Sequence, residues 1–454
     1  MQTQERTNAE PIEQTADALW RPLTQHATAQ PPLVLVQGHG CTVVDANGNE
    51  YFDAMAGLWC VNVGYGEERL IDAATRQLRQ LPYTPLVRPA ASALELATRL
   101  VEVLPGDLNH VVFLNSGSEA VETALKIARQ YARQRFPQQN RTKIISRYRG
   151  YHGWTAGALG ATGQPVRKTH YEPLLAGSIH VRPPDTFRLF SGMSPREAAQ
   201  CLAQELEEVI EFEGPESIIA FIGEPIIGGG GIIVPPDEYW PLVRKICSAY
   251  GILLIHDEVI TGFGRTGEMF GCEHWGVVPD IMTMAKGISS GYIPLSATAV
   301  SDEVFDAFKG DLADNVQFNQ ISTYGGHPVA CAVGLENLAV IEERRLVENS
   351  ARMGTLLGSG LQELKAQHDI VGDVRGRGLL WGLELVQPGT RDPLPAPQVN
   401  RVIAEVLQRG MIVGKNVATV PRLECVVTIA PPLIVTEADV ERIVVTIDKA
   451  LQTV

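Results

Sequence analysis

The chain has 454 residues, with 38 lysines and arginines against 52 aspartates and glutamates, so its formal charge is −14. Apolar residues make up 45% and charged residues 20%, an ordinary globular mixture in a chain long enough for two large domains. The acid excess argues against a nucleic-acid backbone or an anionic membrane as the main partner, and no run of about 18 apolar residues could span a bilayer.

The first expected elements are short strands within residues 33–54, where apolar and polar residues alternate around turns at Gly38–Gly40 and Asn47–Gly48. This alternation fits packing on either domain, and we assign residues 1–70 to a segment that packs with the smaller one. The segment Met1–Asp17 before them is polar and lacks an apolar core, so we expect no signal peptide.

From about residue 70 to residue 330, apolar strand-like runs alternate with segments of helical period. The expected strands are His110–Leu114, Lys143–Ser146, Ile218–Gly223, Ile252–His256 and Ile281–Ala285. The expected helices are Glu119–Arg135, Pro195–Glu213, Pro236–Tyr250 and His327–Glu343. Because unalternating apolar strands are typical of buried parallel sheets, we expect a large α/β domain over residues 71–330, with helices on both faces of a mostly parallel sheet.

The remaining residues, 331–454, predict a second, smaller α+β domain. Its expected strands are Val374–Arg377, Leu380–Leu385 and Val426–Ile429, and a closing helix is expected to start at Thr436.

Three segments of the large domain carry chemistry, and the first joins a strand to a helix at Phe113–Glu119 (FLNSGSE). Ser118 is the expected N-cap, Gly117 lets an anion approach the backbone, and Ser116 adds a second hydroxyl. Since a helix N-terminus attracts anions, a phosphate cup is one interpretation, and a well-capped helix without a ligand is the other.

The second segment, Ile252–Val259 (ILLIHDEV), ends an apolar strand in two adjacent acids. Ligands of open parallel sheets lie at the carboxyl ends of the strands. Asp257 could there hold a protonated heterocyclic nitrogen or a metal ion, or the two acids could simply belong to a loop.

The third segment, Asp280–Gly287 (DIMTMAKG), ends another apolar strand in Lys286. Partial burial disfavours the charged form of an amine and makes it nucleophilic, whereas a surface lysine is the alternative. A phosphate cup, a carboxylate and a lysine at one edge of a sheet together describe a pyridoxal-phosphate site.

Two other site types are not expected. Gly262–Gly267 matches GxGxxG, but the stretch after it has two more glycines and no helical period, so it does not predict a dinucleotide site. The ten histidines form no HExxH motif and no ligand-spaced cluster, so we expect no metal. Seven scattered cysteines without a CxxC pair are typical of reduced thiols in a cytoplasmic protein.

Over nearly its whole length the chain resembles the class III (ω-) aminotransferases, pyridoxal-phosphate enzymes of fold type I. The motifs that carry this resemblance are Gly57–Gly66, Asn115–Glu119, Tyr151–Gly153, Gly223–Pro225, Asp257–Gly267, Ala285–Gly287 and Ser322–Pro328. The resemblance implies an α/β large domain with a mostly parallel seven-stranded sheet, a smaller α+β domain, and pyridoxal 5′-phosphate as the cofactor.

The resemblance also implies a role for each matching residue. Lys286 would bind the cofactor covalently and move the proton, and Asp257 would pair with the pyridine nitrogen. The other expected cofactor contacts are Ser116, Gly117 and Ser118 at the phosphate, Val259 and Tyr151 on the two faces of the ring, and His152 and Glu224 nearby.

Three further residues concern the partner subunit and the substrate. Thr323 would reach the phosphate of a neighbouring subunit, which implies a homodimer or a tetramer with shared sites. Trp59 and Tyr151 would line the substrate pocket. Arg422 is the only arginine in the interval where many amine–pyruvate relatives have a mobile carboxylate clamp, so it is either that clamp or a surface residue; Lys415 nearby could act only as a point charge.

Within the family, the chain looks most like the pyruvate-dependent branch that includes taurine–pyruvate aminotransferases. The expected reaction moves an amino group from a primary amine or an ω-amino acid, taurine-like or β-alanine-like, to pyruvate. A 2-oxoglutarate-dependent aminotransferase, an aminomutase and a catalytically inactive binding module on the same fold are the alternatives.

Overall fold

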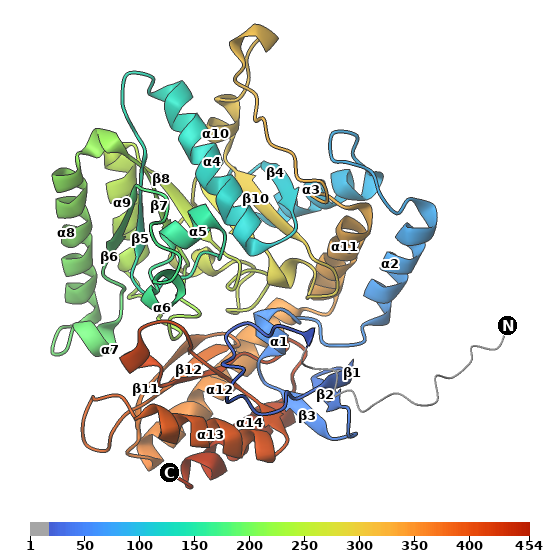
Figure 1. The fold of residues 1–454 in the computed structure, drawn as a ribbon, viewed down its shortest axis with the longest axis vertical. Helices are drawn as coiled ribbons and strands as arrows, with labels where there is room; N and C mark the ends of the chain where they lie inside the picture. Colours follow the sequence, from blue (N-terminus) through green and yellow to red (C-terminus); the bar gives the residue numbers. More distant parts are fainter. Residues whose placement is uncertain (1–17) are drawn as a thin grey trace.

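The computed structural model describes residues 18–454, so the expectation about Met1–Asp17 lies outside it. Its centre is a seven-stranded sheet with the order β4-β10-β9-β8-β7-β5-β6 (Figure 1). β10 (Ser296–Val300) is antiparallel to both neighbours, and all other pairs are parallel. The predicted mostly parallel seven-stranded sheet is therefore confirmed.

The strands of this sheet largely match the predicted ranges. β4 (His110–Leu114) and β7 (Ile218–Gly223) have the predicted bounds, β5 (Lys143–Arg147) and β9 (Ile281–Met284) differ by one residue at one end, and β8 (Leu253–Asp257) is shifted by one residue at both ends. β6 (Ser178–Val181) and β10 were not predicted, because β6 has only four residues and β10 is rich in serine, alanine and threonine, so both lack the apolar signal of a buried strand.

Helices cover both faces of the sheet. α4 (Gly117–Arg135) packs on β9 and β10, and its apolar residues share a core with β5, β7 and β8. On the other face, α8 (Pro195–Glu213) and α9 (Tyr239–Tyr250) enclose a second core. The prediction placed the N-cap of α4 at Ser118, which is wrong: Ser116 is the cap, and its hydroxyl accepts from the Glu119 N–H at 3.2 Å.

The smaller domain is built on an antiparallel sheet with the order β11-β12-β15-β14. Its strands are β11 (Val371–Arg377), β12 (Leu380–Leu385), β15 (Val426–Ile429) and β14 (Gly414–Lys415). The helices are α12 (Leu346–Gln367), α13 (Ala396–Gln408) and α14 (Glu437–Leu451). Thr436 caps α14 through a capping box with Asp439, as expected for a helix that starts there.

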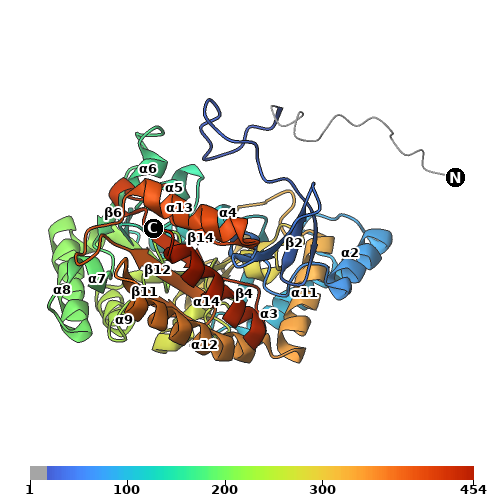
Figure 2. The same cartoon turned by 90° about the horizontal axis from the view of Figure 1, so that it is seen from below.

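The N-terminal meander forms β1 (Leu35–His39), β2 (Thr42–Asp45) and β3 (Glu50–Asp53). β3 pairs in parallel with β13 (Met411–Ile412), which follows α13, and both views place β2 beside the smaller domain (Figures 1 and 2). This pairing is long-range, so the local alternation of residues carried no information about it.

The predicted boundary between residues 330 and 331 falls inside one helix. α11 (Pro328–Glu343) packs on α2 (Glu68–Gln80) and α3 (Ala91–Val103) of the large domain. The chain therefore leaves the large domain after α11, nearer to the start of α12 than the sequence pattern predicted.

Three general features complete the fold. Between residues 18 and 454, no helix combines the length and the apolar character needed to cross a bilayer. The seven cysteines are all unpaired in the structure. Gly262–Gly267 opens no α-helix, and the next helical element is a 3₁₀ turn at Gly271–Trp275.

Candidate active site

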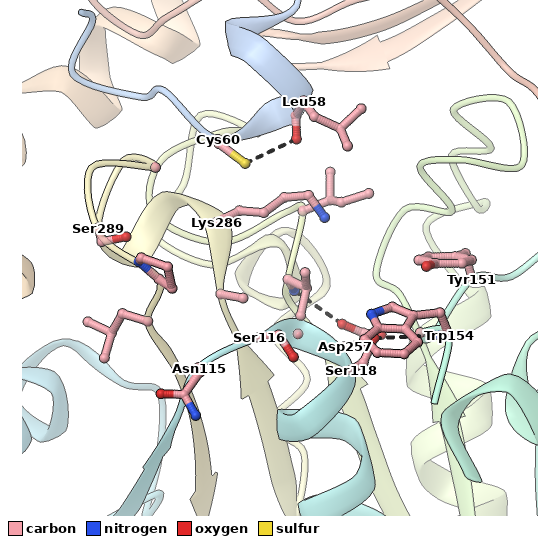
Figure 3. A pocket seen from close by; sticks show the side chains of 18 of the residues that line it. Leu58, Cys60, Asn115, Ser116, Ser118, Tyr151, Trp154, Asp257, Lys286 and Ser289 are labelled. Atoms are coloured by element: carbon pink, nitrogen blue, oxygen red, sulfur yellow. Dashed lines mark hydrogen bonds between the residues drawn. The ribbon is translucent and has the colours of Figure 1, made fainter. Parts of the chain in front are cut away.

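A cavity of about 360 Å³ opens at the carboxyl ends of β7, β8 and β9 (Figure 3). This is the edge of an open parallel sheet at which ligands bind. The cavity brings together most of the predicted site residues: Ser116, Gly117, Ser118, Tyr151, His152, Glu224, Asp257, Val259 and Lys286. They come from distant parts of the sequence and meet because their strands end side by side.

The N-terminus of α4 forms one end of the cavity. The first N–H groups of a helix have no partner within the helix, so they are free to bind an anion. The buried Ser118 hydroxyl accepts from the Trp154 N–H at 3.1 Å. A Cβ on Gly117 would lie 3.0 Å from Cγ1 of Val259, so glycine lets the helix end and Val259 approach this closely. This end of the cavity is suited to a phosphate.

Asp257 supplies a fixed carboxylate at the end of β8. Its Oδ2 lies 2.8 Å from Nδ1 of His152, and its Oδ1 accepts from the Val259 N–H and from the Thr283 hydroxyl, both at 3.2 Å. The side chain is buried, so these donors replace the water that it lacks. Asp257 is therefore a preoriented acceptor for a protonated ring nitrogen.

Lys286 follows β9 and carries the amine of the site. Its φ of 47° lies in the left-handed region, which is uncommon for a residue with a side chain and costs backbone strain. Figure 3 shows the side chain reaching across the cavity above Ser116 and Asp257. Nζ lies 5.9 Å from the centroid of the Trp59 ring. The backbone thus starts this side chain at the rim of the cavity, and its amine lies in the cavity.

Glu224 and Tyr151 form a linked pair at the opposite side. Oε1 of Glu224 accepts from the Tyr151 N–H at 3.0 Å and Oε2 accepts from the Gly228 N–H at 2.8 Å. Complete burial raises the pKa of this carboxyl. The geometry gives Glu224 the role that the sequence left open: it fixes the segment that carries Tyr151.

Arg167 was missed in the sequence. It lies in α6 (Pro165–Lys168), and its Cζ is 4.7 Å from the centroid of the Tyr151 ring. Its Nε donates to Gln164 Oε1 at 2.7 Å and its Nη2 to the Val417 carbonyl at 3.3 Å. Burial lowers its pKa. An arginine in a short polar segment gives no sequence signal for such a contact.

Three predicted residues lie outside the lining of this cavity. The ring of Trp59 lies next to the amine of Lys286. Thr323 is exposed, and its carbonyl accepts from the Tyr83 hydroxyl at 2.9 Å. Arg422 lines a different cleft, together with Lys168 and Arg391. The lining also contains Leu58 and Cys60, which the Gly57–Gly66 motif could have indicated.

The donor set of the cavity fits pyridoxal 5′-phosphate. A primary amine matches the aldehyde, a fixed carboxylate matches the ring nitrogen, and a helix N-terminus beside a glycine matches the phosphate. Backbone N–H groups and hydroxyls donate the hydrogen bonds that a phosphate dianion requires, and an ionised carboxylate accepts the hydrogen bond of a protonated ring nitrogen.

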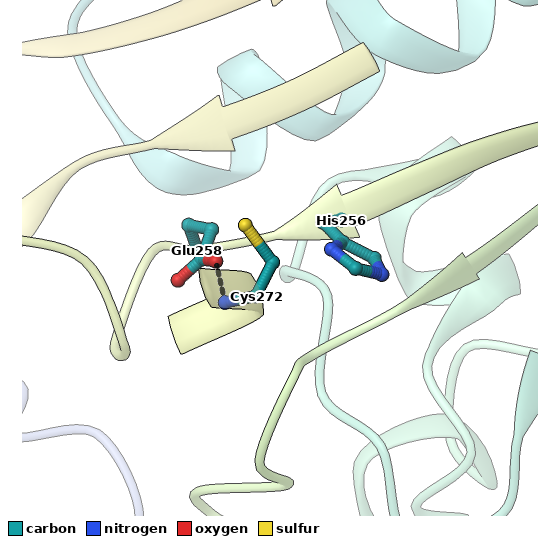
Figure 4. A group of neighbouring side chains, drawn as sticks. All are labelled: His256, Glu258 and Cys272. Carbon is teal, nitrogen blue, oxygen red and sulfur yellow. Dashed lines mark hydrogen bonds between the residues drawn. The ribbon is translucent and has the colours of Figure 1, made fainter. Parts of the chain in front are cut away.

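A second cluster lies behind the same strand end: His256, Glu258 and Cys272, with ligand atoms within 4.8 Å of one another (Figure 4). Glu258 already accepts from the N–H groups of Gly271 (2.9 Å) and Cys272 (2.8 Å) and from the Thr261 hydroxyl. Because protein donors occupy its oxygens, we interpret Glu258 as the member that supports the turn after β8; the two ring nitrogens of His256 have no hydrogen-bond partner among residues 18–454.

The family model for class III aminotransferases matches residues 24–451. An uncharacterized aminotransferase, YhxA, from Bacillus subtilis is 49% identical over 424 residues, which are 93% of this chain and 92% of that protein. A taurine–pyruvate aminotransferase from Bilophila wadsworthia is 40% identical over 439 residues, 96% of this chain and 95% of that protein.

A solved structure gives the same result. The (S)-enantioselective ω-transaminase from Thermomicrobium roseum superposes with a TM-score of 0.92 at 42% identity, and the match covers 99% of each chain. Similarity of this extent includes both domains, so the fold corresponds over the whole chain.

Proposed function

This chain belongs to the class III aminotransferases, which are pyridoxal-phosphate-dependent enzymes, and from that premise we propose that it transfers the amino group of a primary amine or an ω-amino acid to pyruvate. The products would be an aldehyde or ketone and alanine. The observation that carries the proposal is the meeting of Lys286, Asp257 and the N-terminus of α4 in one cavity.

Each residue has a defined task in this reaction. When bound, the cofactor supplies an aldehyde carbon that accepts the amino group and a ring that withdraws electrons from the carbon losing its proton. Lys286 Nζ takes that proton and returns it one step later. Asp257 holds a proton on the ring nitrogen, and His152 fixes the orientation of the Asp257 carboxylate at 2.8 Å.

The remaining residues bind and position. Ser116, Gly117 and Ser118 would hold the phosphate, and Val259 and Tyr151 would enclose the ring. Trp59 would border the amine-binding side next to Lys286. We assign no substrate contact to Arg422, since it lines another cleft.

Pyruvate is supported as the acceptor by the taurine–pyruvate aminotransferase to which the chain is similar over 95% of that protein's length. The test uses the absorbance of the bound cofactor. A panel of amine donors that includes taurine should bleach the visible band, and pyruvate should restore it. Recovery with 2-oxoglutarate alone would favour the 2-oxoglutarate-dependent alternative, and no bleaching by any amine would refute the proposal.

We also propose that the enzyme works as a homodimer in which Thr323 contacts the phosphate of the partner's cofactor. Thr323 is exposed and is flanked by Ile321 and Tyr324, whose side chains are 63% and 62% exposed. Contact with a partner subunit would bury these two large apolar side chains. Sedimentation would test the oligomer, and Thr323→Val should weaken retention of the cofactor. The unpaired cysteines fit a cytoplasmic location.

A further inference from the structure

A second cleft, of about 580 Å³, lies where the carboxyl ends of β5 and β6 face the smaller domain. Tyr148 directly follows β5, and Arg182 directly follows β6. The opposite wall comes from 391–393 and 420–423, two loops of the smaller domain. Figure 1 shows α6 and α7 (Thr186–Leu189) at the edge of the large domain nearest β11 and β12. Small-molecule sites favour both strand ends and domain interfaces.

The charge of this cleft is opposite to that of the whole chain. Its lining contains six basic side chains and one acidic one, Asp392, in a protein with a net charge of −14. Carboxylate partners neutralise three of the six: Arg149 pairs with Asp185, Arg182 with Glu205 and Arg188 with Glu384. A cleft lined by one sign of charge concentrates the opposite ion.

The other three cations, Lys168, Arg391 and Arg422, have no carboxylate within 4.0 Å among residues 18–454. Lys168 ends α6, and burial lowers the pKa of its amine. Arg391 uses Nη1 to donate to the Phe187 carbonyl at 3.2 Å, so its other nitrogens remain available. These cations come from both domains and from three separate segments of the chain.

The cleft also offers one aromatic surface. The Tyr148 ring stacks on His180 with centroids 5.3 Å apart, and the residue is 52% exposed. Its exposed part lies in the cleft lining together with Lys168. A planar group could therefore lie against Tyr148 while a charged group meets the cations.

We propose that this cleft binds a small organic anion of the phosphate monoester class, bridging the two domains between Lys168 on one side and Arg391 and Arg422 on the other. A phosphate group accepts several charged hydrogen bonds at once, and arginine forks and a lysine amine are its usual donors. The site is separate from the cofactor cavity, with which its lining shares no residue.

The test is calorimetric titration of the cofactor-loaded enzyme, whose own phosphate site is filled, with phenyl phosphate. Phenol and inorganic phosphate separate the contributions of the ring and the charge. We expect phenyl phosphate to bind, phenol not to bind, and the double variant Lys168→Met/Arg391→Leu to bind about tenfold more weakly or worse. Lys126→Met removes a charge from the exposed face of α4 and should leave the affinity unchanged.

Transaminase activity of the variants is measured in parallel, because the two positions lie outside the cofactor cavity and binding can then fail independently of the reaction. A ligand that bridges the domains should also raise the unfolding temperature of the wild type but not of the double variant. If the double variant folds poorly, the two single variants replace it, and each is expected to bind phenyl phosphate about threefold more weakly than the wild type. Equal affinities in wild type and variants, or no binding of phenyl phosphate at millimolar concentration, would overturn the proposal.

Discussion

The end of β8 has two sides, and the same stretch of three residues serves both. Asp257 faces the cofactor cavity, whereas His256 and Glu258 belong to the cluster with Cys272 behind it. Successive side chains of a strand point to opposite faces, so this division follows from the backbone alone. All three residues are buried, and they differ in what their polar atoms meet.

On the cavity side the hydrogen bonds orient a carboxylate and leave room for a ligand. On the back side the donors close around Glu258, and burial raises the pKa of its carboxyl. The two adjacent acids therefore have different surroundings: Asp257 faces the cavity, where we propose that it pairs with the cofactor ring, and Glu258 accepts hydrogen bonds from the turn behind it. Substituting residues on each side separately, and measuring both activity and stability, tests this comparison.

The largest effect is expected on the cavity side, at Lys286. Lys286→Ala removes the amine that holds the cofactor and moves the proton, so turnover should fall about 10⁴-fold or more. Steady-state rates with an amine and pyruvate measure the loss. Borohydride reduction followed by peptide mapping should label Lys286 in the wild type and no other lysine. Label on another side chain would contradict the assignment.

The next test substitutes the adjacent acids separately. Asp257→Asn keeps the shape but cannot hold a proton on the ring nitrogen, so turnover should fall about 10²- to 10³-fold. Stability should change little, because the amide oxygen still accepts from Val259 and Thr283 and the amide nitrogen meets only the His152 ring, which can accept. Glu258→Gln should show the reverse, a loss of about 1–3 kcal/mol in the free energy of unfolding, because buried N–H groups lose acceptors. Rates and urea unfolding of both variants measure the two effects.

The distinction between the two acids would fail if both variants showed the same loss. If both variants lost activity equally, Glu258 would also act on the cavity side. If both lost stability equally, the hydrogen bonds from His152 and Thr283 to Asp257 would be as important to the fold as those to Glu258.

The sequence predicted the cavity side better than the back side, and the reason is local. Asp257 and Lys286 each end an apolar run, so a pattern of a few residues locates them at the edge of a parallel sheet. The cluster behind β8 depends on Cys272 returning to Glu258 after a turn, which no local pattern encodes.

Long-range placement explains the other differences. The sequence indicated a helix start near Gly117, but only the structure shows that Ser116 is its N-cap. Arg422 could be chosen only by elimination within a loop, and the structure places it in the second cleft. The pairing of β3 with β13 joins segments about 360 residues apart, for which the sequence offers spacing but no register.

A third prediction concerns the pH dependence of the back side. Burial, with Arg147 and Arg244 nearby, lowers the pKa of His256 to about 3, while the unfolded chain has about 6.5. The unfolded state therefore binds a proton that the folded state does not, and stability falls as the pH drops below about 6.5. From pH 7 to pH 5 this one group should cost about 2 kcal/mol.

His256→Leu removes the titrating ring and should reduce that pH-dependent loss while leaving activity near wild type. Urea unfolding of both proteins at pH 7 and pH 5 measures the difference. Parallel pH curves for wild type and variant would show that His256 is protonated in the folded state as well.

The smallest effect is expected one contact away from the cavity, at Arg167. Its guanidinium touches the Tyr151 ring and ties it to Gln164 and to the Val417 carbonyl, but it does not line the cavity. A cation over an aromatic ring is worth about 0.5–2 kcal/mol, so Arg167→Met should weaken cofactor binding by the apo-enzyme about two- to tenfold. Arg167→Lys keeps the charge over the ring but lacks the guanidinium fork. Its affinity for the cofactor should lie between those of the wild type and Arg167→Met. Since only Tyr151 transmits the effect, Tyr151→Leu should make the Arg167 substitution silent; an undiminished loss in the double variant would mean that Arg167 acts through the loop at Val417 instead.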